Sequence, residues 1–333
     1  MSDPDSTERR LAQLAVAVAV ALVGAFVGYL LFVVVPVGGP TVLGMVLVVL
    51  VGLVAFRVGG RIASRAVPRY NVAEVAVEGP ITRDGSPGAV PTGGPAASAD
   101  DVVEQIEQAD GDGNSEALLL RLNTPGGEIV PSDDIRNAAV DFDGPTVAYA
   151  TDTCASGGYW IASGCDELLA RDTSLVGSIG VIGSRVNASR FAEELGLSYE
   201  RFAAGEYKDA GVPLREIDDH EREYLQGIVD DFYQHFVERV ARGRDVPPGV
   251  VRETEARVYI GERAADLGLV DALGTREDAL DRLEDRLDRP VGATEFPPSR
   301  SVVSRLSGGA RGVAYAFGAG LAGRVDDDVS FRL

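Results

Sequence analysis

The sequence TDTCASGGYWIASGCDELLARDTSLVGSIGVIG, residues 151–183, decides the fold expected for this chain. The run 146–150 before it is typical of a β-strand and residues 159–162 within it are typical of a helix, so Ser156 lies where a strand ends and a helix begins. Small neighbours let the backbone turn sharply there, and a helix start offers free N–H groups to a developing oxyanion. The pattern therefore predicts a nucleophilic serine at a strand-to-helix turn.

Lys208 is the only lysine among the 31 basic residues, and arginine supplies every other positive side-chain charge. Arginine stays protonated in proteins, whereas a desolvated lysine can lose its proton and serve as a general base. A serine nucleophile needs such a base. The alternative interpretation is that a surface arginine drifted to lysine, but the surrounding sequence AGEYKDAG favours a catalytic role.

Five motifs, in the expected order, resemble the signal peptide peptidase A family of serine proteases with a Ser/Lys dyad. The resemblance extends over residues 72–287, and its motifs read LLLRLNTPGGEI at 118–129, CASGGYWIAS at 154–163, VGSIGVIG at 176–183, AGEYKDAG at 204–211 and ERAADLGLVD at 262–271. By this resemblance Ser156 is the nucleophile and Lys208 the general base. They are far apart in the sequence, so the fold must bring them together.

The resemblance implies the α/β fold of the Clp protease and crotonase superfamily, built from repeated ββα units. It also implies that the amides of Gly127 and Gly157 form the oxyanion hole, although the turn 123–127 taken alone is more typical of a plain glycine turn between a strand and a helix. Ser178 has two interpretations. Its hydroxyl holds the lysine amine, as the family pattern supports, or it is a serine at the edge of a strand.

Other nucleophiles fit the sequence less well. Cys154 and Cys165 lie among small and apolar residues, which favours buried free thiols over a reactive cysteine or a disulfide framework. His220 and His235 both lie on one predicted helix, 216–242, and neither is in a loop motif that would present an imidazole to a nucleophile. A Ser-His-Asp triad is therefore disfavoured.

Two apolar runs, 11–35 and 41–58, precede the soluble part of the chain and predict a transmembrane helical hairpin within residues 1–70. The breaker 36–40 between them is too short to form a domain. The turn of the hairpin contains no arginine, but arginines flank the hairpin on both sides. They are Arg9, Arg10, Arg57, Arg61, Arg65 and Arg69. The positive-inside rule then places both flanks, and the catalytic domain, in the cytoplasm of a membrane-bound protein, whereas resemblance to bacterial relatives favours the outer face.

Residues 71–290 alternate predicted strands and helices and are expected to form a protease domain. The expected strands are 72–77, 117–122, 166–170 and 178–182, and the expected helices are 100–109, 189–195, 216–242 and 277–288. Residues 79–98 are rich in Gly and Pro, which indicates a loop at a substrate entrance. Residues 291–333 lose the pattern, so a disordered tail is expected.

The predicted helix 216–242 is amphipathic. Its apolar residues recur at helical spacing, and the stripe is either part of the core or a contact between subunits. The stripe consists of Tyr224, Leu225, Ile228, Val229, Phe232, Phe236 and Val240.

The chain has a formal net charge of −20, with 51 acidic residues. Nucleic acid is therefore not an expected partner, because a phosphate-binding face needs clustered positive charge. Such an acidic, lysine-poor composition is typical of a high-salt cytoplasm, where screening reduces self-repulsion. We see no metal-ligand spacing or phosphate loop, so no cofactor is expected.

Together these patterns predict a membrane-anchored serine endopeptidase that cuts short hydrophobic peptides, such as signal peptides left in the bilayer. A crotonase-like acyl-CoA enzyme and an inactive membrane scaffold of the same fold are the alternatives. Only one copy of each motif is present, as in the half-length members of the resembled family. By that resemblance the chain forms a homo-oligomeric ring, in which the serine of one subunit meets the lysine of its neighbour.

Overall fold

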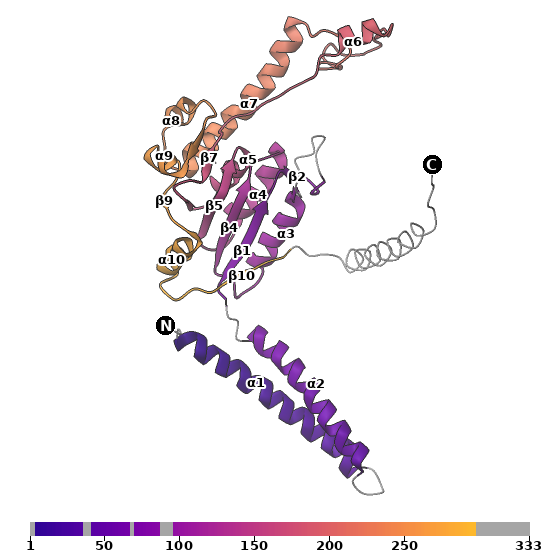
Figure 1. The fold of residues 1–333 in the computed structure, drawn as a ribbon, viewed down its shortest axis with the longest axis vertical. Coiled ribbons are helices and arrows are strands. Elements are labelled where there is room, and N and C mark those ends of the chain that lie inside the picture. The colour runs from indigo at the N-terminus through magenta and orange to yellow at the C-terminus, as the bar shows by residue number, and fades with distance from the viewer. Residues whose placement is uncertain (1–3, 36–40, 67–69, 87–95, 298–333) are drawn as a thin grey trace, which may run out of the picture.

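The computed structural model describes residues 4–35, 41–66, 70–86 and 96–297. Figure 1 shows three parts: a helical hairpin, an α/β unit, and a long projection that leaves the α/β unit on the side opposite the hairpin. We call residues 183–230 the arm. The described residues 70–182 and 231–297 are called the body.

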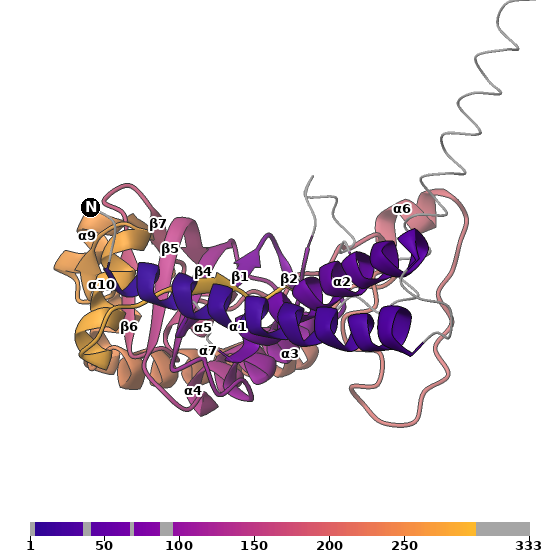
Figure 2. The same ribbon diagram turned by 90° about the horizontal axis from the view of Figure 1, so that it is seen from below.

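The hairpin consists of α1 (Pro4–Tyr29), which continues into the π-helical turn η1 (Leu30–Val34), and α2 (Val42–Ala66). The two helices lie side by side (Figures 1 and 2). A Cβ placed on Gly24 would lie 2.3 Å from the Cβ of Ala55, so the missing side chain allows close approach of the helices. Segments Leu11–Val34 and Val42–Ala63 are long and apolar enough to cross a membrane, and the second helix continues beyond the end expected at residue 58.

The described part of the body contains an eight-stranded sheet with the order β10-β1-β4-β5-β6-β9, whose successive pairs are all parallel. β7 pairs with the end of β5 in parallel, and β8 pairs with β7 in antiparallel fashion. The strands are β1 (Val72–Glu78), β4 (Ala117–Thr124), β5 (Thr146–Ala155), β6 (Glu167–Ala170), β7 (Leu175–Gly177), β8 (Val258–Ile260), β9 (Ala272–Leu273) and β10 (Ala293–Glu295). A separate short sheet pairs β2 (Ile81–Thr82) with β3 (Ala97–Ser98).

Helices cover both faces of the main sheet, so its central strands β1, β4, β5 and β6 are mostly buried, as is usual for parallel sheets. One face packs against α3 (Ala99–Asp110), α4 (Ile129–Asp141), α5 (Gly157–Ala162), α9 (Gly261–Asp266) and the C-terminal half of α7 (Asp219–Gly243). The other face packs against α10 (Arg276–Leu287) through Ala279 and Leu283. The short helix α8 (Pro248–Glu253) also contributes the buried Val251. The α/β architecture predicted from the sequence is therefore confirmed.

The arm is built on the N-terminal half of α7, which extends away from the sheet and carries residues 183–218, including α6 (Ser189–Glu194), near its far end (Figure 1). Large apolar side chains remain exposed there, and Phe202 is 92% exposed. Large apolar side chains are thus exposed in the arm, whereas the body buries such side chains in its core.

Two expectations differ from the structure. Residues 178–182 were expected to form a strand, but the strand in this region is β7, which ends at Gly177. Gly177 has φ +111° and Ser178 has φ +52°, and neither conformation continues a strand. In addition, β10 pairs with β1 beyond the boundary expected at residue 290, so the sheet includes the start of the expected tail. The rest of that tail, 298–333, and residues 87–95 of the expected entrance loop lie outside the described residues.

Candidate active site

Ser156 occupies the turn between β5 and α5. Its φ of +51° and ψ of −119° are rare for a residue with a side chain, and such strain persists only where the surroundings hold it. Two backbone hydrogen bonds fix this turn. The Ser156 amide donates to the Gly177 carbonyl at 2.9 Å, and the Ser156 carbonyl accepts from the Trp160 amide at 2.9 Å. The strand-to-helix turn predicted at this serine is therefore present.

The glycine turn after β4 is pressed against Ser156. A Cβ on Gly126 would lie 2.5 Å from the Gly157 nitrogen and 2.8 Å from the Ser156 Cβ, and a Cβ on Gly157 would lie 3.1 Å from the Gly127 nitrogen. The amides of Gly127 and Gly157 therefore lie in the same small space as the serine. Only glycine permits this approach.

The segment carrying β2 fixes this turn. The Ile81 amide donates to the Gly126 carbonyl at 3.0 Å, and the Glu128 amide donates to the Ile81 carbonyl at 3.0 Å. These two hydrogen bonds join Ile81 to Gly126 and Glu128, and neither of them uses the Gly127 amide. Gly157 is the first residue of α5, where backbone N–H groups have no intrahelical acceptor. The amides of Gly127 and Gly157 thus both lie beside Ser156, as an oxyanion hole would require.

Ser178 lies beside Ser156 because β5 and β7 are parallel neighbours with Ala155 opposite Gly177. Each serine is the residue directly after one of these paired positions, and the two have nearly equal positive φ values, +51° and +52°. The Ser178 amide donates to the Arg257 carbonyl at 2.9 Å, which fixes its turn.

Both serines line one cavity of about 560 Å³ at the base of the arm. Apolar side chains from the segment after Ser178 and from α7 form much of its wall, and two carboxylates also line it. Its lining residues are Ser156, Ser178, Gly180, Val181, Ile182, Gln226, Val229, Asp230, Tyr233, Glu255 and Ala256. A site of this size and character suits apolar side chains of a peptide.

Lys208 is not among the residues that line this cavity. It is exposed and lies in the arm, on a turn where its amide donates to the Gly205 carbonyl at 3.4 Å. The described contacts include no hydrogen bond between Lys208 and Ser156. Within one chain, the structure therefore does not bring the two predicted dyad residues together.

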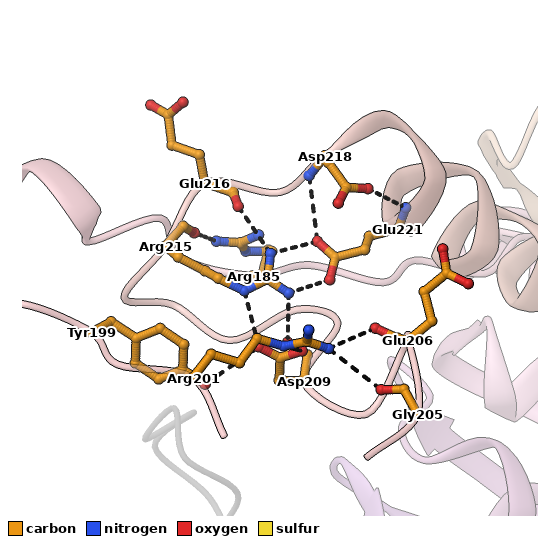
Figure 3. A network of polar contacts seen from close by, with 10 residues as sticks. All are labelled: Arg185, Tyr199, Arg201, Gly205, Glu206, Asp209, Arg215, Glu216, Asp218 and Glu221. Atoms are coloured by element: carbon orange, nitrogen blue, oxygen red, sulfur yellow. Dashed lines mark hydrogen bonds and ion pairs between the residues drawn. The ribbon is translucent and has the colours of Figure 1, made fainter. Parts of the chain in front are cut away.

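A polar network contacts residues on both sides of Lys208, and Figure 3 shows Gly205, Glu206 and Asp209 within it. The Asp209 carboxylate accepts from Arg201 Nε at 2.8 Å and from Arg215 Nε at 3.0 Å, and Arg215 also contacts the Glu221 carboxylate through Nη1 at 2.7 Å. The hydrogen bond from Arg215 is the main reason why the pKa values of Asp209 and Glu221 are lowered. This network was not expected from the sequence, although acidic and arginine residues lie close to the only lysine there.

The other candidate nucleophiles do not fit. Cys154 and Cys165 are free and fully buried, and burial raises the pKa of both thiols, to about 12 for Cys165. A thiol in that state is not a nucleophile at neutral pH. His220 and His235 lie on α7 and do not line the cavity that Ser156 lines. Among the described residues, no group of three His, Cys, Asp or Glu side chains could hold a metal ion.

Residues 138–289 match the family model described as Peptidase family S49. A protease-named protein of Synechocystis sp., slr0021, is 40% identical over 166 residues, which are 49% of this chain and 60% of that protein. A protein of Enterococcus faecium named as a signal peptide peptidase SppA is 36% identical over 186 residues, which are 55% of this chain and 54% of that protein.

Serine protease SPPA, chloroplastic, of Arabidopsis thaliana is 29% identical over 251 residues, which are 72% of this chain and 36% of that protein. The chain spans little more than half the length of the first two relatives, and less of the third. The resemblance predicted from the five motifs is confirmed by these matches.

Proposed function

We propose that this chain is a membrane-anchored serine endopeptidase that works through an acyl-enzyme, since residues 138–289 match the model of peptidase family S49. The observation that carries the proposal is the strained turn at Ser156, with the amides of Gly127 and Gly157 beside it and a largely apolar cavity in front of it. Nucleophile, oxyanion donors and a place for the substrate thus lie together.

In this mechanism the Ser156 hydroxyl oxygen attacks the scissile carbonyl carbon while a base accepts its proton. The Gly127 and Gly157 amides donate to the negative oxygen of the tetrahedral intermediate. The base then gives the proton to the leaving amine, which departs and leaves an acyl-enzyme on Ser156. Water attacks this ester with the same base accepting its proton, and collapse of the second intermediate returns the proton to the serine.

The general base is Lys208 in its neutral form, supplied by another subunit. No lysine or histidine lines the cavity of one chain, and the carboxylates of Asp230 and Glu255 that do line it are weak bases for a serine hydroxyl. Lys208 lies in the arm, which projects from the body (Figure 1). In an oligomer the projecting arm would bring Lys208 to the body of a neighbouring copy. The apolar side chains exposed along the arm fit a homo-oligomeric assembly, of which a ring is the closed form.

Ser178 would hold the Lys208 amine once the neighbouring arm is in place. Its hydroxyl belongs to the same cavity as Ser156, and its turn is fixed by the backbone contact with Arg257. A hydrogen bond of this kind orients the base toward the serine proton.

Hydrophobic peptides, such as remnant signal peptides, are the proposed substrates. The cavity wall contains Val181, Ile182 and Val229, and the helical hairpin would keep the site close to a bilayer. We place the catalytic domain in the cytoplasm because arginines cluster on both flanks of the hairpin. In sealed right-side-out cells the domain should then resist added protease, and cleavage there would reverse the orientation.

A fluorophosphonate probe tests the proposal directly. It should label the wild-type oligomer at Ser156, and Ser156→Ala should abolish labelling while Ser184→Ala, which alters an exposed serine outside that cavity, should not. Lys208→Arg should fold normally and be nearly inactive, because arginine does not give up its proton. A wild-type protein that is never labelled, in an oligomer that binds peptides, would support an inactive scaffold instead.

A further inference from the structure

We propose that Arg201, Asp209 and Arg215 are positioning residues that fix the turn carrying Lys208 and keep its amine free of a carboxylate partner. The inference rests on the proposed role of Lys208 as general base. It adds to that role a reason why the lysine loop can be ordered before it meets a serine.

The backbone on both sides of Lys208 is clamped (Figure 3). On the N-terminal side, Arg201 Nη2 donates to the Glu206 carbonyl at 2.8 Å and to the Gly205 carbonyl at 3.4 Å. On the C-terminal side, Arg215 Nη2 donates to the Asp209 carbonyl at 3.4 Å. Two guanidinium groups therefore hold the short turn from residue 205 to residue 209, and bidentate arginine contacts have a fixed geometry.

The clamp is joined to α7. Arg215 bridges Asp209 and Glu221, and Glu221 completes a capping box with Asp218 at the first turn of the helix. The Glu221 side chain is only 5% exposed, although it lies in the arm. Arg185 adds a bond from Nη2 to the Arg215 carbonyl at 2.7 Å. The lysine turn should consequently move with α7 as one unit.

The charges explain why the clamp contains arginines. Asp209 is the residue next to Lys208, and a free carboxylate there would attract the ammonium group and favour the protonated form, which cannot act as a base. In the structure both carboxylate oxygens of Asp209 are taken by Arg201 and Arg215, and its side chain is 10% exposed. The described ion pairs include none made by Lys208.

The other titratable groups near Asp209 do not replace this pairing. Tyr199 donates its hydroxyl to Asp209 at 3.3 Å, and Glu221 faces Asp209 from α7 only across the Arg215 guanidinium. Tyr207 stacks on Tyr224 of α7 with ring centroids 4.8 Å apart, which fixes the other flank of Lys208. The net charge of the two arginines with Asp209 and Glu221 is zero.

The test measures kcat and KM against pH for full-length variants in detergent. The activity should rise with pH as Lys208 loses its proton, and we call this rise in kcat the alkaline limb. Arg215→Gln removes one of the two positive charges that pair with Asp209, so the alkaline limb should move to higher pH by roughly half a unit. Asp209→Asn leaves the arginine charges in excess and should move the limb to lower pH. Each variant should lose about 10- to 100-fold in kcat with little change in KM, since neither residue lines the cavity.

Three further variants complete the design. Arg215→Lys keeps the positive charge but loses the bidentate geometry of the guanidinium group. It should leave the alkaline limb at its wild-type pH while kcat stays reduced. Arg263→Gln, an equal charge change at an exposed arginine of α9, should leave kcat and the limb unchanged. The double variant Arg215→Gln with Asp209→Asn should bring the limb back toward the wild-type position.

Opposite shifts in the two single variants support the inference, and a purely structural role would lower activity without moving the limb in opposite directions. Wild-type kcat and limb in Arg215→Gln and Asp209→Asn, or shifts of the same sign, would overturn the inference and leave the dyad intact. Lys208→Ala, measured alongside, separates the two claims. Full activity there would overturn the dyad itself, and the inference with it.

Discussion

The body buries large apolar side chains, whereas the arm leaves them exposed, and α7 passes through both. In the C-terminal half of this helix Phe236 and Val240 are buried against the body, whereas Tyr224 and Ile228 in the N-terminal half are 45% and 37% exposed. The apolar stripe on this helix was expected to be either core or subunit contact. In one chain its C-terminal half is core, and its N-terminal half remains available for a contact.

The same division separates the two proposed catalytic residues. The body holds Ser156 by strand pairing, a strained turn and two close glycines, all within a buried surrounding. The arm holds Lys208 by a surface network of ion pairs, away from any sheet. A proposed nucleophile held in the body and a proposed base on the projecting arm fit the proposal that assembly completes the active site.

The largest expected effect on stability comes from comparing two phenylalanines. Phe236 is 2% exposed and packs on Trp160 with ring centroids 4.8 Å apart, so Phe236→Ala should lower the free energy of unfolding by about 3–5 kcal/mol. Phe202 is 92% exposed, so Phe202→Ala should change it by less than about 0.5 kcal/mol in the monomer. Denaturant unfolding of both variants measures the difference.

Phe202→Ala should nevertheless weaken the oligomer, because the arm is proposed to bury its apolar side chains against another copy. Sedimentation at several concentrations would show this as a shift toward monomer. Equal losses of unfolding free energy in the two variants would contradict the division between body and arm.

Two glycines with nearly equal φ values give a smaller effect. Gly126 has φ +96° and Gly205 has φ +98°, so an alanine is strained at both positions, by about 1–2 kcal/mol. At Gly126 the new Cβ also meets the Gly157 nitrogen and the Ser156 Cβ, whereas at Gly205 nothing lies within 4 Å. Gly126→Ala should therefore cost a further 1–3 kcal/mol or so, and should remove most activity by displacing the proposed oxyanion donors.

Unfolding free energies and probe labelling of Ser156 together test the glycine comparison. Gly205→Ala should keep the labelling. If Gly126→Ala is labelled as fast as wild type, the close approach of the glycine turn is not needed for the nucleophile.

Acid should loosen the arm with the smallest effect of the three. The pKa values of Asp209 and Glu221 are lowered in the folded state, so their pairing with Arg215 stabilises fully above the unfolded values of about 4. That contribution is lost as pH falls below about 4 and through the lower folded pKa values, and it does not change between pH 5 and 8. Pepsin digestion with mapped cleavage sites should then show cuts within 183–218 as the pH is lowered.

Asp209→Asn provides the control for the acid experiment, because its side chain no longer titrates and the pH-dependent step should shrink. If pepsin first cuts the body and leaves the arm intact, the ion pairs of Asp209 and Glu221 with Arg215 do not determine the acid stability of the arm.

The turn at Ser156 could be predicted because local sequence determines it: a β-type run, small residues and a helix start follow one another without a gap. The same logic failed at 178–182. Those residues alternate like a strand, but the positive φ of Gly177 and Ser178 and the bond from the Ser178 amide to Arg257 redirect the chain, and neither is visible in a hydrophobic pattern.

The arm and its network could not be predicted for a related reason. Periodicity marks apolar positions on helix 216–242, but it does not say which half meets the body, since that depends on where residues distant in sequence are folded. Likewise, Arg201 and Arg215 are spread on either side of Lys208, and only the fold shows that both reach Asp209.

The most direct test of the account mixes two inactive subunits. Ser156→Ala and Lys208→Ala chains, carrying different tags, are co-expressed, and oligomers that contain both are isolated through the two tags in turn. If the body of one subunit uses the lysine on the arm of its neighbour, the isolated mixed oligomers should regain at least about one quarter of the wild-type peptidase activity, because in a random mixture half of the subunits keep the serine and half of their neighbours keep the lysine. No activity above that of the separate variants, in oligomers shown to contain both chains, would place serine and base within one subunit and contradict the shared site.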